Sequence, residues 1–305
     1  MLNIWRLQLL VQLEKLGTMR LVAEVMLVSP ATVSTQLRVL ENETNTVLLE
    51  KVGRNVELTI AGQKLVKQVT PILNQLESVT NEIEDSSQRI QGTVRIVAFS
   101  SALQTIVIPA ASQIKKQHPQ INMTLTEMEP DQSMPALDSH QFDIAVIAYF
   151  GAENLGVNND YKLIKLGTDH LQVLVGKDSP LSDNEDISIN ELKNQHWILE
   201  PQNAYLAGAV HKLCNNAGFK PNVLGICQSY TTLQKAVSCN LAVGILPTLA
   251  ITEPLTQIKL LNFKPTTVRH IYLVIRKPQM SVRAIQVMVQ AIQEQAARVF
   301  LPAER

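Results

Sequence analysis

The stretch LVSPATVSTQLRVLE, Leu27 to Glu41, predicts a helix with a sharply defined start and two unlike faces. Ser29 is a favoured N-cap residue. Pro30 takes the first helical position, where its missing N–H group costs nothing and its fixed φ suits the helix. Apolar residues recur at the helical period and are expected to form the buried face: Val33, Leu37 and Leu40.

Small and polar side chains occupy the opposite face of this helix. A helix that enters the major groove of DNA needs such a face, an N-terminus that can approach phosphates and a buried side that keeps it rigid. Pro30 and Ala31 are placed to contact thymine methyl groups or sugar edges. Ser34 and Thr35 are placed to hydrogen-bond base edges or phosphates. The sequence therefore predicts a DNA-reading helix.

The residues around this helix complete a winged helix-turn-helix over residues 1–58. A first helix is expected from Ile4 to about Gly17, and Thr18 can cap a second one. After the third helix, Asn45 can adopt the left-handed conformation that ends a helix. The segment VLLEKVGRNVELT then predicts two short strands joined around residues 53–55, which form the wing.

The wing is expected to bring Lys51, Arg54 and Asn55 to the flanking minor groove or backbone. Arg38 is placed for a phosphate or for Glu41 on its own helix. An ordinary helical domain, in which the helix start is only a cap, remains the alternative. The residues predicted to contact DNA are Thr18, Ser29, Pro30, Ala31, Ser34, Thr35, Arg38, Lys51, Arg54 and Asn55.

Residues 59–91 are predicted to form one long linker helix that joins two chains. Apolar residues alternate steps of four and three, the spacing of a coiled-coil seam. The seam residues are Leu65, Val69, Ile72, Leu76, Val79 and Ile83. Pro71 lies off the seam and is expected to kink the helix. The alternative is a single amphipathic helix packed on its own domain.

The remainder, residues 92–305, alternates strand and helix patterns, which predicts an α/β domain with a parallel sheet. Two sets of these elements predict two lobes with a crevice between them. Lobe I is expected to hold about residues 92–167 and 267–305, and lobe II about residues 168–266. The predicted fold class is thus α/β, with a winged helix-turn-helix, a coiled-coil linker helix and a two-lobed domain like a periplasmic binding protein.

The composition limits the partners of the chain. Among 305 residues, 27 are basic and 27 acidic, and residues 1–58 hold six of each, so DNA binding by one head should be weak. Two joined heads offset this through effective concentration. No uninterrupted apolar run of about 18 residues occurs and no secretion leader is evident, so a cytoplasmic protein without a membrane span is expected.

Other chemistry finds no support in the sequence. Cys214, Cys227 and Cys239 form no C-x-x-C pair and are interpreted as buried thiols, with redox sensing left open. The six histidines lack metal-ligand spacing. No Walker loop, G-x-G-x-x-G or G-x-S-x-G motif occurs, and no catalytic residue, metal or cofactor is predicted.

The order of these parts resembles the LysR-type transcriptional regulators of bacteria over essentially the whole chain. The segment LGTMRLVAEVMLVSPATVSTQLRVLE, followed by VLLEKVGRNVELTIAG, is similar to the signature of that family. The segments GTVRIVAF, FDIAVI, NNAGFKPNV and AVSCNLAVGILP resemble its effector-domain landmarks in the expected order.

The resemblance implies an effector-responsive regulator that forms a homodimer or homotetramer, binds interrupted palindromes in double-stranded DNA and bends them, with RNA polymerase as a further candidate partner. The base-reading tip falls on Pro30, Ala31, Ser34 and Thr35. Relatives often carry arginine or glutamine at the position of Thr35, so a bidentate base contact there is in doubt. The resemblance does not identify the effector, the target genes or the sign of regulation.

The family's effector lies between the lobes, near helix N-termini that favour an anion. Pro130 stands where relatives often have a hydroxyl. A two-lobed solute-binding protein and an α/β enzyme with an accessory helical domain remain alternatives. The candidate effector-binding residues are Ser100, Ser101, Asn203, Ala204, Tyr205, Ser229 and Tyr230.

Overall fold

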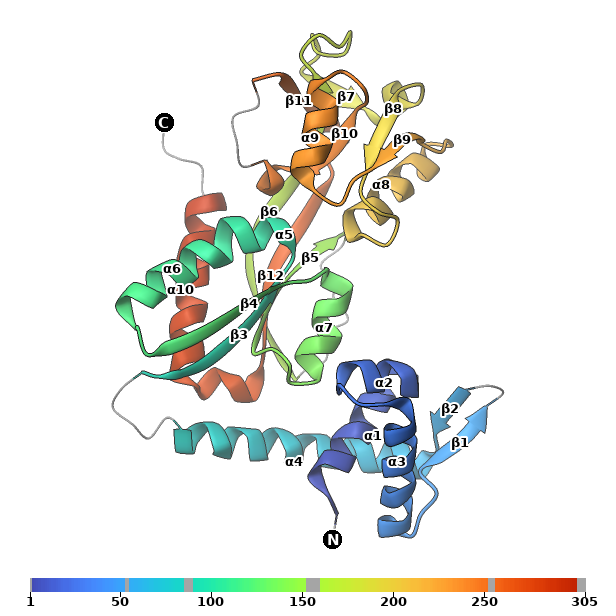
Figure 1. Ribbon diagram of the computed structural model, residues 1–305, viewed down its shortest axis with the longest axis vertical. Helices are drawn as coiled ribbons and strands as arrows, with labels where there is room; N and C mark the ends of the chain where they lie inside the picture. Colours follow the sequence, from blue (N-terminus) through green and yellow to red (C-terminus); the bar gives the residue numbers. More distant parts are fainter. Residues whose placement is uncertain (1, 53–54, 85–89, 152–159, 252–255, 301–305) are drawn as a thin grey trace.

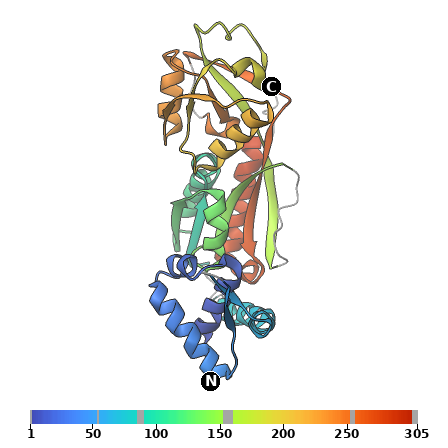
Figure 2. The ribbon, with the colours of Figure 1, turned by 90° about the vertical axis from the view of Figure 1, so that its right-hand side faces the viewer.

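A computed structural model describes residues 2–52, 55–84, 90–151, 160–251 and 256–300. Figure 1 shows a helical head at one end, a long helix that leaves it, and an α/β part above them. Figure 2, turned by 90°, shows the two lobes of the α/β part stacked on the head along the long axis.

The head contains three helices and a two-stranded wing. The helices are α1 (Ile4–Leu16), α2 (Met19–Val25) and α3 (Pro30–Thr44). The wing pairs β1 (Leu49–Val52) with β2 (Asn55–Leu58) in antiparallel fashion. Both the number and the order of these elements are those expected from the sequence.

The predicted helix caps of the head are confirmed. Thr18 Oγ1 accepts a hydrogen bond from the backbone N–H of Leu21 at 3.3 Å. Ser29 Oγ accepts one from the N–H of Thr32 at 3.0 Å, at the start of α3. Asn45 ends α3 with a left-handed φ of 47°. A side-chain cap of this kind stabilises a helix by about 1 kcal/mol, so the start of α3 is fixed locally.

The core of the head lies between α1, α2 and the inner face of α3. Val33, Leu37 and Leu40 are fully buried, as predicted. Gly62 lets α4 (Ile60–Glu84) approach this core, because a Cβ atom at that position would lie 2.3 Å from the carbonyl oxygen of Leu48. The helix that leaves the head is therefore fixed to its body.

Helix α4 runs unbroken past Pro71, and its predicted seam is divided between two surroundings. Leu65 and Val69 pack against the core of their own head. These two residues therefore pack within one domain, because they bury apolar side chains of the head that would otherwise be exposed to water. Ile72 and Leu76 are 56% and 43% exposed. The side chains of the remaining seam residues, Val79 and Ile83, lie outside the described part of the chain.

Lobe I is built on the five strands of a mixed sheet in the order β4-β3-β5-β12-β6. The prediction of a parallel sheet is correct for β3, β4 and β5 and wrong for the two long strands, which run antiparallel to their neighbours. The bounds are β3 (Gly92–Ala98), β4 (Ile121–Glu127), β5 (Ile144–Phe150), β6 (Tyr161–Gly176) and β12 (Val268–Arg276).

Helices cover both faces of this sheet. One face carries the continuous helical run of α5 (Ser100–Ala102), a π-helical segment (Leu103–Val107) and α6 (Ile108–Gln117), together with α10 (Arg283–Phe300). The other face carries α7 (Pro130–Asp138). Figure 1 shows α7 on the side of the sheet that faces the head.

Lobe II is joined to lobe I through β6, which continues beyond its pairing with β12. There β6 pairs with β10 and β11. Trp197 is fully buried in this lobe. The elements are β7 (Asp186–Ser188), β8 (His196–Leu199), α8 (Tyr205–Asn216), β9 (Asn222–Ile226), α9 (Tyr230–Ser238), β10 (Gly244–Pro247) and β11 (Ile258–Lys264), with 3-10 turns at Ile189–Leu192 and Thr248–Ala250. A further 3-10 turn, Lys277–Ser281, joins β12 to α10 in lobe I. In the described ranges, no helix has both the length and the apolar character that a bilayer crossing requires.

Candidate DNA-reading helix and effector cavity

The outer face of α3 presents the polar side chains that the sequence predicts. Ala31, Thr35 and Arg38 are exposed, and Ser34 is half-buried. Ser29 and Pro30 lie exposed at the N-terminal tip of the helix. The buried apolar face on the opposite side holds this outer face rigid, as a helix inserted in a groove requires.

The turn and the wing flank α3. Leu27, in the turn between α2 and α3, is 84% exposed and has a φ of 56°. Lys51 is exposed on β1. Arg54 lies outside the described residues, and so does the side chain of Asn55. Thr18 is exposed, but its hydroxyl caps α2.

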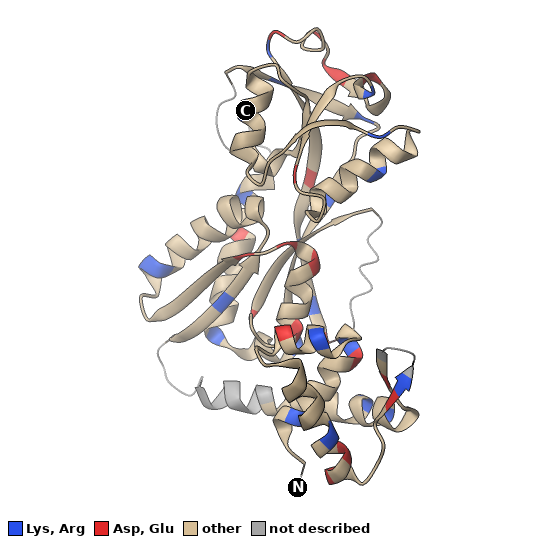
Figure 3. Ribbon diagram, turned by 45° about the vertical axis from the view of Figure 1, so that its right-hand side comes forward, with Lys and Arg blue, Asp and Glu red and all other residues tan. Residues whose placement is uncertain are grey.

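Charged side chains of the head are partly engaged within it, and both signs of charge occur along it (Figure 3). Arg6 Nε donates to Gln36 at 2.8 Å, and its Nη1 pairs with Glu43. The Glu41 carboxylate accepts hydrogen bonds from two backbone N–H groups at the start of β1, at 2.8 and 3.0 Å. The structure thus pairs the Glu41 carboxylate with the backbone at the start of the wing rather than with Arg38.

A cavity of about 380 Å³ lies between the lobes. It brings together three of the predicted effector-binding residues, Ser100 of lobe I with Ser229 and Tyr230 of lobe II. Gln104 Nε2 donates to Ser100 Oγ at 3.1 Å. The N-cap residue of α9, Ser229, makes no side-chain cap, so its hydroxyl is not engaged by the helix that follows it.

Ser101 serves a different purpose from the one predicted. It is buried, and its Oγ accepts a hydrogen bond from Arg269 Nη2 at 2.8 Å. Arg269 also donates to Asp169 Oδ2 at 3.0 and 2.8 Å. Asp169 Oδ1 accepts from the backbone N–H of Leu249 at 3.1 Å, and the guanidinium lies 4.8 Å from the ring centroid of Phe99. This buried network joins lobe I to lobe II beneath the cavity.

The N-terminus of α8, predicted as an anion site, already holds a carboxylate of this chain. The backbone N–H of Tyr205 donates to Glu129 Oε2 at 3.1 Å. The ring of Tyr205 stacks on Phe150 at 5.4 Å, and its hydroxyl accepts from the Phe150 N–H at 3.1 Å. Ala204 is the N-cap residue, and Asn203 is exposed beside it. Glu129 thus links the lobes where a ligand carboxylate was expected.

Three glutamates that line the cavity were missed from the sequence: Glu127, Glu129 and Glu200. Burial, reinforced by the nearby Glu129, raises the pKa of Glu200 to about 7. Burial also raises the pKa of Glu129. Glu127 ends β4, and Glu200 directly follows β8. Their position at carboxyl ends of strands, where α/β sheets bind ligands, was the signal that could have found them.

The cysteines lie apart from this chemistry. Cys214 is buried, and burial raises the pKa of its thiol to about 11. Cys227 is half-buried and Cys239 is exposed. The prediction of buried thiols is therefore correct for Cys214 and wrong for Cys239. A buried thiol with a raised pKa is a poor nucleophile.

The head contacts lobe I directly. Gln12 Nε2 donates to the carbonyl oxygen of Asp138 at 2.8 Å, and Lys15 Nζ lies 3.3 Å from Asp138 Oδ1. Gln141 donates to the carbonyl oxygen of Val25 at the end of α2. These contacts fix the C-terminal end of α7 against α1 and α2.

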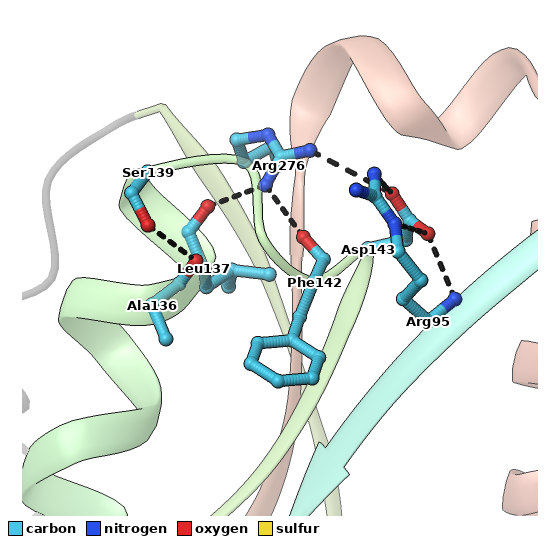
Figure 4. A network of polar contacts seen from close by, with 7 residues as sticks. All are labelled: Arg95, Ala136, Leu137, Ser139, Phe142, Asp143 and Arg276. Carbon is cyan, nitrogen blue, oxygen red and sulfur yellow. Dashed lines mark hydrogen bonds and ion pairs between the residues drawn. The ribbon is translucent and has the colours of Figure 1, made fainter. Parts of the chain in front are cut away.

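A polar network supports this end of α7 from inside lobe I (Figure 4). Arg276, at the end of β12, donates to the carbonyl oxygens of Leu137 and Phe142 and lies 4.0 Å from Asp143 Oδ1. Asp143 also accepts from Arg95 Nη2 at 2.8 Å. The network ties the sheet to the segment that touches the head.

Comparisons with known proteins match the two parts of the chain separately. Residues 4–63 match the family model of the bacterial regulatory helix-turn-helix protein of the lysR family, and residues 87–297 match that of the LysR substrate binding domain. The transcriptional dual regulator GltC of Bacillus subtilis is 25% identical over 231 residues, which cover 75% of each chain.

Solved structures show the same fold. A full-length, singly substituted OxyR from Pseudomonas aeruginosa has a TM-score of 0.62 at 20% identity, over 96% of this chain and 98% of that one. CbnR complexed with its target DNA has a TM-score of 0.54 at 17% identity, over 96% and 100%. Since its head and its two-lobed part match the two family models, the chain belongs to the LysR family of transcriptional regulators, with a DNA-binding helix-turn-helix and an effector-binding domain.

Proposed function

We propose that this protein is a cytoplasmic LysR-type regulator in which α3 reads the major groove and the cavity between the lobes binds a small-molecule effector. The observation that carries the proposal is the outer face of α3, polar and exposed above a fully buried apolar face. The working units are residues 1–58, 59–91 and 92–305.

The assignment of DNA contacts follows the exposure of the side chains. Ala31 and Thr35 are the exposed small side chains nearest the tip of α3, and they suit base edges and thymine methyl groups. Arg38, one turn further along, suits a phosphate. Lys51 on the wing suits the flanking backbone. Phosphate contacts set the register of the helix, and the short side chains of α3 provide sequence choice.

Two heads act together in this proposal. Ile72 and Leu76 are large apolar side chains that α4 leaves exposed, and they follow the heptad spacing of a seam. A second copy of α4 would cover them. The resulting dimer or tetramer would bind an interrupted palindrome, because twofold symmetry in the protein matches twofold symmetry in the operator. RNA polymerase is a further candidate partner in activation.

The effector is assigned to the cavity because both lobes line it. Ser100 and Gln104 come from lobe I, and Ser229, Tyr230 and Thr231 come from lobe II. A ligand that contacts residues of both lobes favours the relative placement of the lobes to which it binds more tightly. The size of the shift is set by the difference between its affinities for the alternative placements. The contacts between α7 and the head provide a physical link to the DNA-binding unit.

A gel-shift titration tests the DNA-binding function. The full chain is titrated against duplex DNA from upstream of its own gene and against random duplex of equal length, each at two salt concentrations. We expect preferential binding to the upstream duplex, weakened by salt because counterions are released from phosphates. Equal affinity for both duplexes would refute the proposal. Ser112, exposed on α6, provides a matched alanine control for substitutions in α3.

A further inference from the structure

The charge of the cavity between the lobes indicates what kind of molecule it takes. Three of the described side chains that line it are carboxylates, those of Glu127, Glu129 and Glu200, and none of the described lining residues is lysine, arginine or histidine. The other polar lining groups are hydroxyls and amides, among them Ser100, Ser229 and Gln234. A carboxylate ligand placed here would meet like charges, which costs affinity.

The nearest buried cation offsets these carboxylates only in part, since burial outweighs its effect and leaves the pKa of Glu129 and Glu200 raised. Arg269 is 3% exposed and is paired with Asp169, which is 2% exposed, at 2.8 Å. The pair is neutral as a unit. The positive end of α8 is likewise engaged, because its first N–H group donates to Glu129. The requirement for an anion at this helix start is thus met by the chain itself.

Glu200 supplies a second, independent observation. Its Oε2 atom is buried and has no hydrogen-bond partner within the described part of the chain. A buried carboxylate oxygen without a donor is unfavourable, since its desolvation is not compensated. A ligand that brings N–H donors and a positive charge would remove this cost.

The separation of the carboxylates favours an organic cation over a metal ion. Within the described ranges, no three histidine, cysteine, aspartate or glutamate side chains are close enough to ligate one metal. Carboxylates that face a cavity of about 380 Å³ without converging on one point suit a molecule with N–H donors at more than one place.

We propose that the effector of this protein is a small organic cation bearing N–H donors, such as a diamine or a basic amino acid, bound by Glu127, Glu129 and Glu200. This inference rests on the proposed function of the cavity and names its ligand class. It replaces the anionic effector expected from helix N-termini, because the carboxylates of the cavity outweigh the free N–H groups at the start of α9.

The binding should depend on pH. The groups that face Glu200 are Glu127, Glu129, Tyr230 and Arg269. Because burial raises the pKa of Glu200 to about 7, a bound cation would favour its ionised form and release a proton. Affinity for the cation should therefore increase as pH rises through about 7 and level off above it.

Thermal-shift and calorimetric titrations of the full chain test the inference. The probes are putrescine, cadaverine, L-lysine and L-arginine, with glutarate and 1,5-pentanediol as anionic and neutral matches. We expect at least one amine to raise the melting temperature and the matches to leave it unchanged. The E127Q/E200Q variant should bind that amine about tenfold more weakly or worse. E185Q, a change at an exposed glutamate of lobe II, should bind it as the unaltered chain does.

Two results would overturn the inference. One is a melting shift with glutarate that survives in E127Q/E200Q. The other is the absence of any amine whose binding differs between the unaltered chain and that variant. Gel shifts on the same preparations separate this failure from failure of the proposed function. Retained preference for the upstream duplex would leave the regulator intact and reject only the cationic effector.

Discussion

Replacing Arg269 with methionine should destabilise the two-lobed domain strongly and leave the head unaffected. The substitution removes both hydrogen bonds to Asp169 and the one to Ser101. The Asp169 side chain, which is 2% exposed, would keep a single hydrogen-bond donor, the backbone N–H of Leu249. A buried carboxylate left in this way is one of the few perturbations that cost more than a typical core substitution.

The magnitude follows from the burial of the pair. Removing one partner of a buried ion pair costs about 3–5 kcal/mol. For domains of about 150–250 residues, each kcal/mol lowers the melting temperature by about 2–4 °C, so a decrease of about 6–20 °C is expected. The Asp169→Asn variant, which keeps an acceptor for Leu249, should lose a similar amount because it leaves the guanidinium unpaired.

The two tryptophans make the assay specific to each unit. Trp5 lies in the head and Trp197 is fully buried in lobe II. In a Trp5→Phe background, the fluorescence of Trp197 follows the two-lobed domain alone. A Trp197→Phe background follows the head alone. When R269M is added to each background, the melting temperature should decrease in the Trp5→Phe background, where Trp197 is the fluorophore. It should stay unchanged in the Trp197→Phe background, where Trp5 is the fluorophore.

The reasoning also requires coupling between the two charges. The double variant R269M/D169N should be more stable than the sum of the single losses predicts, because it leaves no unpaired buried charge. Additive losses, or a loss for R269M below about 1 kcal/mol, would show that the pair does not hold the lobes as described.

Three further outcomes are expected. Replacing Ser34 and Thr35 with alanine should reduce the preference for the operator over random duplex by about tenfold without changing the mass of the oligomer, since each good base contact provides about 1–3 kcal/mol of discrimination; unchanged preference in gel shifts would place the reading face elsewhere. Replacing Ile72 and Leu76 with lysine should dissociate the dimer, and an unaltered mass in gel filtration would reject the seam. Burial raises the pKa of Glu200 in the folded chain from 4.5 to about 7, so the contribution of this group to stability is present below about pH 4.5 and is lost as pH rises through about 7. The melting temperature should therefore fall between these pH values by more in the unaltered chain than in E200Q. Parallel melting curves for the two proteins would contradict the burial of Glu200.

The head could be predicted from sequence because its signals are local. The caps at Thr18, Ser29 and Asn45 depend on residues within three or four positions, and the buried face of α3 depends on one helical period. The outcome for Leu65 and Val69 shows the limit of periodicity. A seam for a partner chain and a stripe that covers the chain's own head have the same spacing, and only the fold separates them.

The cavity was harder to predict because its groups come from distant parts of the chain. Glu129 reaches the N-terminus of α8, 76 residues away, and Ser101 reaches Arg269, 168 residues away. No local pattern marks such pairs. The antiparallel long strands were missed for a similar reason, since a buried apolar run has the same appearance in a parallel or an antiparallel neighbourhood.

Strand β12 carries an arginine near each of its ends, and they serve different regions. Arg269 lies in the buried network below the cavity, and Arg276 holds the end of α7 that contacts the head. Seven steps of extended chain separate them, roughly 23 Å. One strand, without an intervening loop, therefore connects the buried network between the lobes to the end of α7 that contacts the head.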